Sequence, residues 1–298
     1  MRDKLPISVI MLTLNEEANL PGAIENVETW AEDIFIVDSL SSDHTVDIAL
    51  AKGIKVIQRP FTNFGDQWNF ALEKLPVYSP WTCKLDPDER FSDQLIADID
   101  LAIQSDNTKA GYGFRRRLWF MGKPMRITQK IIRIWRTGSC RFTDVIVNEH
   151  PIIDGKVGFL KGILEHLDSC SLHEWWDKQN RYTTMEAIMR TRGDQLAVAP
   201  KIFGNALQRR MFLKKLFPKV PFRFQILFLS DLFGRGAILD GSRGWMWAHL
   251  RSELYRMIEL KAEEMAQTGY IPEIPRKTGN WDPRVLESKL QQSVLDPR

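Results

Sequence analysis

The sequence predicts an α/β protein organised on a mostly parallel β-sheet. Three short apolar runs, at residues 7–14, 34–37 and 54–58, have the composition of buried strands, and segments of helical periodicity separate them. Strands and helices that alternate in this way form parallel sheets with right-handed crossovers. A chain of 298 residues that is 44% hydrophobic can also bury a substantial core.

The run at 7–14 is nearly all apolar, as expected of a central strand covered on both faces. The polar residues 15–17 end it. Asn19 can cap the following helix, which has Pro21 in its first turn. This is the first βα unit.

The second strand, 34–37, ends at Asp38, and a polar loop then leads to a helix and the third strand at 54–58. A carboxylate at this end of a strand can accept hydrogen bonds from a nucleotide base or ribose, or it can simply begin a turn. Another helix opens at 65–71. Its Gln67 and Asn69 can face a nucleotide or be ordinary polar surface positions.

The next predicted strand, 80–86, carries Asp86 at its carboxyl end, where open α/β sheets place their ligand crevice. Pro87 cannot donate to a sheet, so the strand should stop there. Alternate residues of an extended turn point the same way, which lets Asp86 and Asp88 share one divalent cation and bridge two phosphates. The alternative is an acidic loop that caps the next helix.

Charge and cysteine content narrow the possible classes of protein. The net charge of +3 gives no general argument for nucleic-acid binding. Cys83, Cys140 and Cys170 are few and widely spaced, which argues against a disulfide framework and a structural zinc site and favours a reducing cytosol. We predict neither a signal peptide nor a transmembrane helix, since the apolar stretch at 224–230 is too short to span a bilayer.

Four stretches in order, 13–17, 37–45, 65–71 and 85–89, resemble the nucleotide-sugar-binding half of the family 2 inverting glycosyltransferases, which have the GT-A fold. The resemblance covers about residues 5–170. Residues 175–261 more loosely resemble the branch that builds lipopolysaccharide cores and other bacterial cell-surface glycans.

The resemblance implies that Asp38 contacts the base of the donor and that Asp86 and Asp88 hold Mg²⁺ or Mn²⁺ on its diphosphate. Two residues depart from the family pattern: Pro87 stands where Ala is frequent, and Leu40 replaces a common Gly. The full predicted set of nucleotide-sugar-binding residues is Thr13, Asn15, Glu16, Asp38, Gln67, Asn69, Asp86, Arg115 and Arg117.

Arg115 and Arg117 belong to a segment, 111–123, in which aromatic and basic residues alternate. Guanidinium groups here can neutralise a pyrophosphate leaving group, because their planar forks match phosphate oxygens. The alternative is a solvated strand face, which accounts for at least one of Arg115, Arg116 and Arg117. Residues 131–136 predict a further strand.

Inverting transfer needs a base to take the proton of the attacking hydroxyl. By resemblance this base is Glu149, with Asp144 in reserve; without the family, either acid would be a surface residue. His166 can complete the metal shell or bind phosphate, or it can be structural.

From Trp175 onward the pattern is helical. Residues 195–230 contain no acid and mix basic with aromatic side chains, which suits a segment lying on an anionic membrane; plain packing and nucleic-acid binding are the alternatives. A Leu-Asp-Gly turn at 239–241 precedes a final helix, and the chain becomes irregular after Thr268.

The sequence thus predicts a GT-A domain at 1–170, a helical, membrane-associating region at 171–268 and an irregular tail at 269–298. The predicted activity is metal-dependent transfer of a sugar, from a donor such as a UDP-sugar to a lipid-linked or lipopolysaccharide-core acceptor. The predicted location is the inner face of the cell membrane. The alternatives are a sugar nucleotidyltransferase, which the lack of a Gly-rich basic N-terminal loop disfavours, and a non-enzymatic adaptor.

Overall fold

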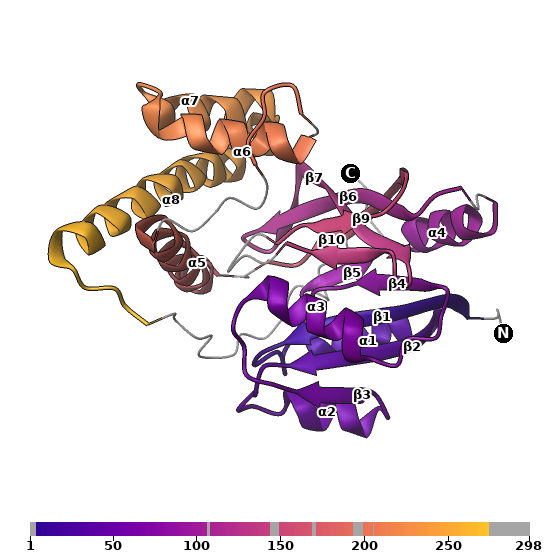
Figure 1. The fold of residues 1–298 in the computed structure, drawn as a ribbon. Helices are drawn as coiled ribbons and strands as arrows, with labels where there is room; N and C mark the ends of the chain where they lie inside the picture. The colour runs from indigo at the N-terminus through magenta and orange to yellow at the C-terminus, as the bar shows by residue number, and fades with distance from the viewer. Residues whose placement is uncertain are drawn as a thin grey trace.

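A computed structural model describes residues 4–105, 108–143, 149–168, 171–192, 199–204 and 206–273. Within them an eight-stranded mixed sheet has the order β3-β2-β1-β4-β7-β6-β10-β5 (Figure 1). Its strands are β1 (Leu5–Thr13), β2 (Ala31–Asp38), β3 (Lys55–Gln58), β4 (Trp81–Lys84), β5 (Glu89–Phe91), β6 (Gly111–Phe120), β7 (Lys123–Arg136) and β10 (Val157–His166). A small second sheet pairs β8 (Cys140–Phe142) with β9 (Pro151–Ile153).

The first half of the sheet is parallel, as predicted. Strands β3, β2, β1 and β4 run in one direction, and α1 (Leu20–Glu28), α2 (Thr45–Ala51) and α3 (Phe64–Lys74) lie in the connections between them. The carboxyl ends of these strands therefore meet at one edge of the sheet. Because β4 ends at Lys84, Asp86 lies just past the strand rather than at its last position.

The second half of the sheet is largely antiparallel. Strand β7 pairs antiparallel with β4 and with β6, and β10 pairs parallel with β6 and antiparallel with β5. The tight turn between β6 and β7 has positive φ at both Met121 and Gly122, which suits a two-residue hairpin. Helix α4 (Asp93–Ser105) packs against β10 with Leu95, Ile99 and Ile103 buried.

Both faces of the sheet are covered, so alternate residues of β1 enter different apolar clusters. Ile7, Val9 and Met11 pack with α1 and α4, whereas Ile10 packs with Trp68 on α3. This two-sided burial explains why the run reads as continuously apolar.

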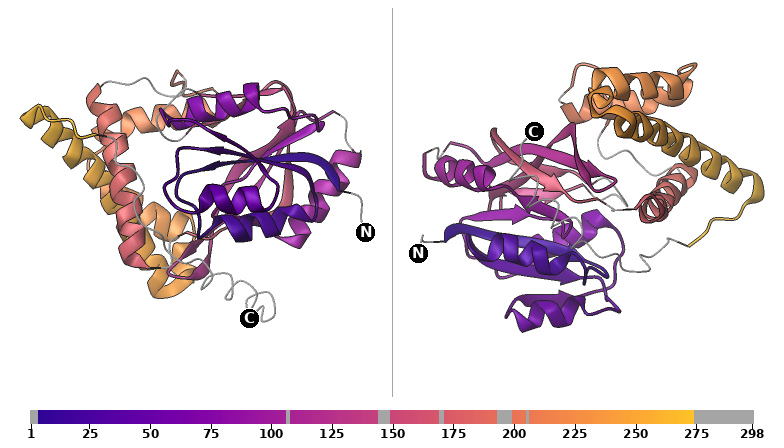
Figure 2. Two further views of the ribbon diagram at one scale, coloured as in Figure 1. Left: turned by 90° about the horizontal axis from the view of Figure 1, so that it is seen from below. Right: turned by 180° about the vertical axis from the view of Figure 1, so that it is seen from behind.

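The C-terminal region is helical and stands beside the sheet (Figures 1 and 2). Phe120 and Met125 of the β6–β7 hairpin pack with Trp175 and Trp247, and Asp240 accepts hydrogen bonds of 3.0 and 3.1 Å from the backbone N–H of Arg126. Within the described part of the chain, no helix combines the length and apolarity needed to cross a membrane. The elements are α5 (Leu172–Arg192), α6 (Ala206–Leu216), η1 (Phe217–Lys219), α7 (Arg223–Leu229), η2 (Ser230–Gly234), η3 (Ala237–Asp240) and α8 (Gly241–Thr268).

The contact between β10 and α4 is tight enough to require a glycine. A Cβ at Gly162 would lie 2.5 Å from Leu95 Cα and 2.8 Å from Leu95 N. We expect Gly162→Ala to lower the free energy of unfolding by about 1–3 kcal/mol, because the added methyl group overpacks this contact. Urea denaturation measures the effect. Lys161→Ala, at the exposed neighbouring position, is the control, and equal stability of the two variants would contradict the close packing.

Candidate active site

Asp38 is fully buried at the carboxyl end of β2, and both of its oxygens accept hydrogen bonds from the protein. Thr13 Oγ1 donates to Oδ1 over 2.8 Å, while Ser41 N and Gln58 Nε2 donate to Oδ2 over 2.8 and 3.0 Å. Asp38 therefore braces its own loop in this structure. Its predicted contact with a base stays a prediction and requires these bonds to open.

The loops that follow β1 and β2 are joined by further hydrogen bonds. Asn15 N donates to Ser41 Oγ over 2.9 Å, and Glu16 N donates to Thr45 Oγ1 over 2.7 Å. The structure thus brings Thr13, Asn15 and Glu16 together with Asp38, and their contact with a nucleotide sugar stays a prediction. Leu40 has a φ of 63°, a left-handed conformation that favours glycine, so the loop keeps the path of a glycine despite the leucine.

The two polar residues of α3 differ in their surroundings. Gln67 is buried and donates to Ser39 Oγ over 3.1 Å, while its Oε1 has no hydrogen-bond partner among the described residues. Asn69 instead exchanges two hydrogen bonds with the backbone of Phe142, at 3.1 and 2.8 Å. Asn69 therefore holds β8 against α3, and this geometry does not support its predicted contact with a nucleotide.

Asp86 lies beside two buried cations, Arg133 and Lys84, just past the end of β4. Arg133 Nη2 donates to Asp86 Oδ2 over 2.6 Å and also to Glu89 Oε1, and Lys84 Nζ lies 3.9 Å from Asp86 Oδ1. Burial raises the pKa of Asp86, but the charges of Arg133 and then Lys84 outweigh it and lower the pKa to about 2. Asp86 is thus ionised at neutral pH.

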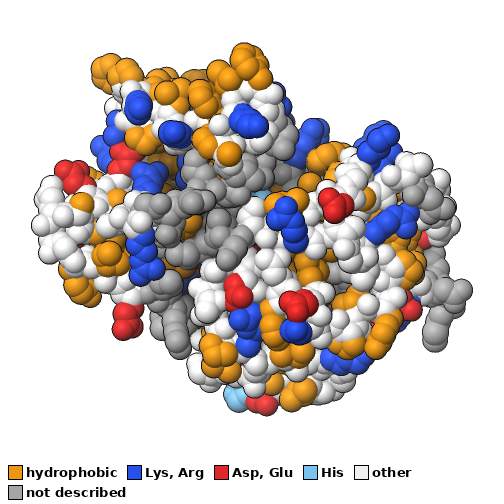
Figure 3. Space-filling model, viewed as in Figure 1, with side chains coloured by type: hydrophobic (Ala, Val, Ile, Leu, Met, Phe, Trp, Pro, Cys, Tyr) orange, Lys and Arg blue, Asp and Glu red, His pale blue; other side chains and the backbone are white. Residues whose placement is uncertain are grey.

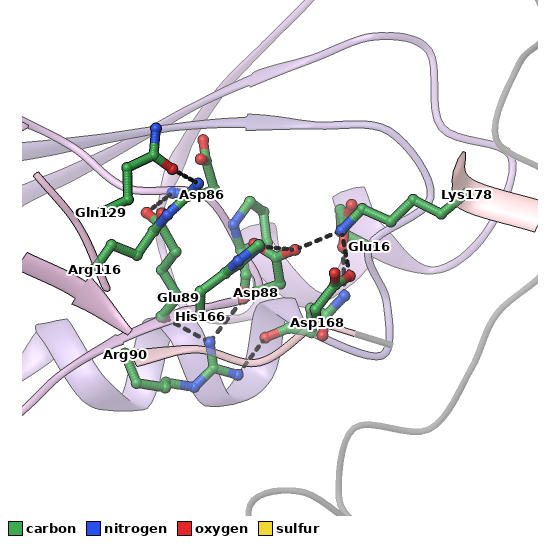
Figure 4. Close-up of polar contacts among 12 residues, drawn as sticks. Glu16, Asp86, Asp88, Glu89, Arg90, Arg116, Gln129, His166, Asp168 and Lys178 are labelled. Carbon is green, nitrogen blue, oxygen red and sulfur yellow. Dashed lines mark hydrogen bonds and ion pairs between the residues drawn. The ribbon is translucent and has the colours of Figure 1, made fainter. Parts of the chain in front are cut away.

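Asp88 is held by a second set of groups. His166 Nε2 lies 3.2 Å and Lys178 Nζ 3.1 Å from its Oδ2, and Lys178 also pairs with Asp168 over 2.9 Å (Figure 4). Burial raises the pKa of Asp88, but Lys178 and then His166 hold it well below the usual value. Asp88 is therefore a second ionised carboxylate next to Asp86.

Glu149 reaches the same place from the chain segment before β9. Lys84 Nζ donates to Glu149 Oε1, so one ammonium group lies between Glu149 and Asp86. Lys84 itself lies over the ring of Trp68, 4.6 Å from the centroid, which fixes its position further. Glu149 thus stands beside the carboxylate pair, whereas Asp144, the reserve candidate, lies outside the described residues.

The arginines of β6 are arranged differently from the prediction. Arg116 Nη1 donates to Glu89 Oε1 over 3.2 Å, on the side of the carboxylates. Arg117 Nε instead donates to Glu165 over 2.9 Å, and Arg115 is exposed. Because side chains alternate along a strand, Arg115 and Arg117 face away from Asp86. Arg116 is therefore the arginine of this strand that contacts the carboxylates, and the contact of Arg115 and Arg117 with a donor stays a prediction.

Two neighbouring ionised carboxylates can supply part of the ligand shell of a divalent ion. Among the described residues no group of three or more His, Cys, Asp or Glu side chains is arranged to hold a metal. His166, predicted as a third ligand, faces Asp88, and its buried Nδ1 has no hydrogen-bond partner in the described chain. Two ionised carboxylates nevertheless suffice where substrate phosphates supply the other ligands, as is common for Mg²⁺.

Several charged residues at the site were not predicted. Arg116, Arg133 and Lys178 come from strands and a helix distant in sequence from Asp86, whereas Lys84 lies two residues before it on β4. Tyr182 lies near these charges as well: burial raises its pKa to about 12, which the Lys178 charge opposes. The unpredicted residues are Lys84, Glu89, Arg116, Arg133, Asp168, Lys178 and Tyr182.

Comparison with known proteins gives a family and several relatives. Residues 8–136 match the family described as Glycosyl transferase family 2. The chain is 28% identical to the lipopolysaccharide core biosynthesis glycosyltransferase LpsC of Rhizobium meliloti over 276 residues, 88% of this chain and 96% of that protein. It is 29% identical to an uncharacterized glycosyltransferase of Rickettsia typhi over 196 residues, 61% of this chain and 66% of the relative, just under two thirds of its length.

A solved structure also resembles part of the chain. It is glucosyl-3-phosphoglycerate synthase from Mycobacterium tuberculosis in complex with Mn²⁺, UDP and glucosyl-3-phosphoglycerate. The match has 19% sequence identity and a TM-score of 0.31, and it covers 37% of this chain and 44% of that one.

Removal of the Asp38 carboxylate tests whether the hydrogen bonds that it accepts stabilise the fold. We expect Asp38→Ala to lower the free energy of unfolding by about 1–3 kcal/mol, since the buried hydroxyl of Thr13 and the donors of Ser41 and Gln58 lose their acceptor. Chemical denaturation measures the loss. Asp47→Ala is the control, because that side chain is 78% exposed. If both variants were as stable as the wild type, Asp38 would not brace the loop.

Proposed function

Since the chain belongs, through residues 8–136, to glycosyl transferase family 2, we propose that it transfers a sugar with inversion from a nucleotide diphosphate donor to an acceptor hydroxyl. One observation carries the proposal: Asp86 and Asp88 are neighbouring ionised carboxylates, and Glu149 shares the Lys84 ammonium with Asp86. A UDP-sugar is the donor that we propose.

In the proposed reaction, each carboxylate has a separate task. Asp86 and Asp88 would hold Mg²⁺ or Mn²⁺, which would neutralise charge on the leaving diphosphate. Glu149 accepts the proton of the attacking hydroxyl, a step to which a positioned carboxylate contributes about 10²- to 10⁴-fold. Lys84 keeps Glu149 at the edge of this site, and Arg133 holds Asp86 in place from the opposite side.

The acceptor that we propose is a lipid-linked saccharide or a lipopolysaccharide core. The similarity to LpsC over 96% of that protein supports it. The surface of the C-terminal helices supports it as well, since acceptors of this kind are embedded in membranes.

That surface has an apolar stripe with basic residues around it. Phe222, Ile226, Leu229 and Phe233 follow one another at helical spacing and are 76%, 52%, 49% and 61% exposed. Figure 3 shows hydrophobic and basic side chains together over α6 and α7. The basic residues of this part of the chain are Lys201, Arg209, Arg210, Lys214, Lys215, Lys219 and Arg223.

An apolar helix face beside basic groups is complementary to an anionic bilayer surface. We therefore propose that the stripe docks the protein peripherally on the inner face of the cell membrane. The enzyme then meets its lipid-borne acceptor in the plane of the membrane.

We expect Asp88→Asn and Glu149→Gln to impair transfer in different ways. Asp88→Asn should abolish both transfer and metal-dependent donor binding, because it removes a ligand charge. Glu149→Gln should retain donor binding but lose about 10²- to 10⁴-fold in turnover. Calorimetry with UDP and Mn²⁺, and release of nucleoside diphosphate from UDP-sugars in the presence of lipid-linked acceptors, measure the two effects.

Asp93→Asn, which changes an exposed acid on α4, is the matched control for both variants. Full activity of Asp88→Asn would refute the metal role. Release of inorganic pyrophosphate from a nucleoside triphosphate and a sugar phosphate would instead indicate a nucleotidyltransferase.

We expect the double change Ile226→Ser and Leu229→Ser to weaken binding to phosphatidylglycerol vesicles at least about tenfold, because it removes apolar surface that would be buried in the bilayer. Vesicle co-sedimentation measures this. The control is Leu50→Ser with Leu101→Ser, which changes leucines that are 57% and 69% exposed on α2 and α4. Equal vesicle binding by both double variants would exclude a role of the stripe in membrane binding. If the wild type and the control were dimers and only Ile226→Ser with Leu229→Ser were a monomer, the stripe would instead join two copies of the chain.

A further inference from the structure

Lys178 of α5 carries an ammonium group against the proposed metal-binding carboxylate. Its Nζ lies 3.1 Å from Asp88 Oδ2 and 2.9 Å from Asp168 Oδ1. Figure 4 shows the side chain extending from α5 towards both acids. Only 25% of Lys178 and 18% of Asp88 is exposed, so neither charge is fully hydrated and each depends on the other.

Lys178 lies within ion-pair distance of both acids at once, so its ammonium group bridges Asp88 and Asp168.

The attachment of α5 does not depend on this ion pair. Trp175 at the start of the helix packs in the cluster around Phe120 and Trp247, and Ile188 near its end packs against Met265 of α8. Lys261 of α8 also donates hydrogen bonds to Asn180 Oδ1 and Thr184 Oγ1, at 2.6 and 2.8 Å. Other contacts therefore hold α5 in place, and the ion pair of Lys178 with Asp88 is not needed for this purpose.

We propose that Lys178 is the resident counter-cation of Asp88. Its ammonium group neutralises the Asp88 carboxylate until a divalent ion binds, and it then pairs with the diphosphate that arrives with the ion. The inference rests on the proposed function, because it takes Asp88 as a ligand of that ion. Two cations at ion-pair distance from Asp88 Oδ2 repel each other, so the ion displaces the ammonium. The long lysine stem allows Nζ to move while Asp168 remains beside it.

Lys178→Met tests the proposal because it removes the charge and keeps most of the side-chain volume. Mn²⁺ alone, followed by electron paramagnetic resonance, should bind about tenfold more tightly, since its competitor is gone. Inorganic pyrophosphate without metal, followed by calorimetry, should bind about tenfold more weakly, since its cation is gone. Lys178→Arg should retain pyrophosphate binding.

Lys261→Met is the matched control, because Lys261 contacts the same helix without pairing to these acids, and it should alter neither affinity. An unchanged Mn²⁺ affinity in Lys178→Met would overturn the proposal. A loss of both affinities together with a lower melting temperature would also overturn it, since that pattern belongs to a purely structural ion pair.

Asp88→Asn separates this inference from the function on which it rests. If Asp88→Asn binds Mn²⁺ as the wild type does, the metal role of Asp88 fails, whatever Lys178→Met does. If Asp88→Asn loses Mn²⁺ while Lys178→Met changes nothing, the metal role stands and only the counter-cation inference fails.

Discussion

The arrangement of the site depends on the compensation of negative charge at one edge of the sheet. Asp86, Asp88 and Glu89 follow β4 within five residues, and Glu89 is fully buried. An isolated buried carboxylate such as Glu89 is strongly unfavourable without a cation at close range, and the partly buried Asp86 and Asp88 are paired with cations as well. Arg133 meets this need for two of them, since it pairs with both Asp86 and Glu89. Burial lowers the pKa of Arg133, but these acids raise it above its usual value.

This requirement explains why the site needs most of the described chain. Lys84 comes from β4, Arg116 from β6, Arg133 from β7 and Lys178 from α5. The antiparallel strands therefore deliver cations to acids that the parallel half positions. Removal of one cation would leave a buried charge uncompensated, which costs more than the pair itself contributes. The acids and their partners must therefore be in place together.

The sequence predicted what is local and missed what depends on three-dimensional pairing. Asp86 and Asp88 were found because they follow an apolar strand and lie one residue apart. Arg116 was missed because successive side chains of a strand point to opposite faces of the sheet. The sequence of one strand does not show which of its two faces is turned towards the site. The structural role of Asn69 was missed because its hydrogen-bond partner, the backbone of Phe142, lies far away in the sequence. Lys178 lies on a helix whose apolar pattern gives no sign of a charged contact.

The C-terminal helices connect the proposed membrane surface to the proposed catalytic carboxylates by direct contacts. Glu259 of α8 pairs with Arg223 of α7, at the base of the apolar stripe, and lies 3.8 Å from Arg190 of α5. Helix α5 in turn places Lys178 against Asp88. If α7 lies on the bilayer, this bracing sets the height and tilt of the site above it. A lipid-borne acceptor then reaches Glu149 only when its hydroxyl stands at that height, so the same helices would select acceptors by the length of saccharide between lipid and attacking hydroxyl.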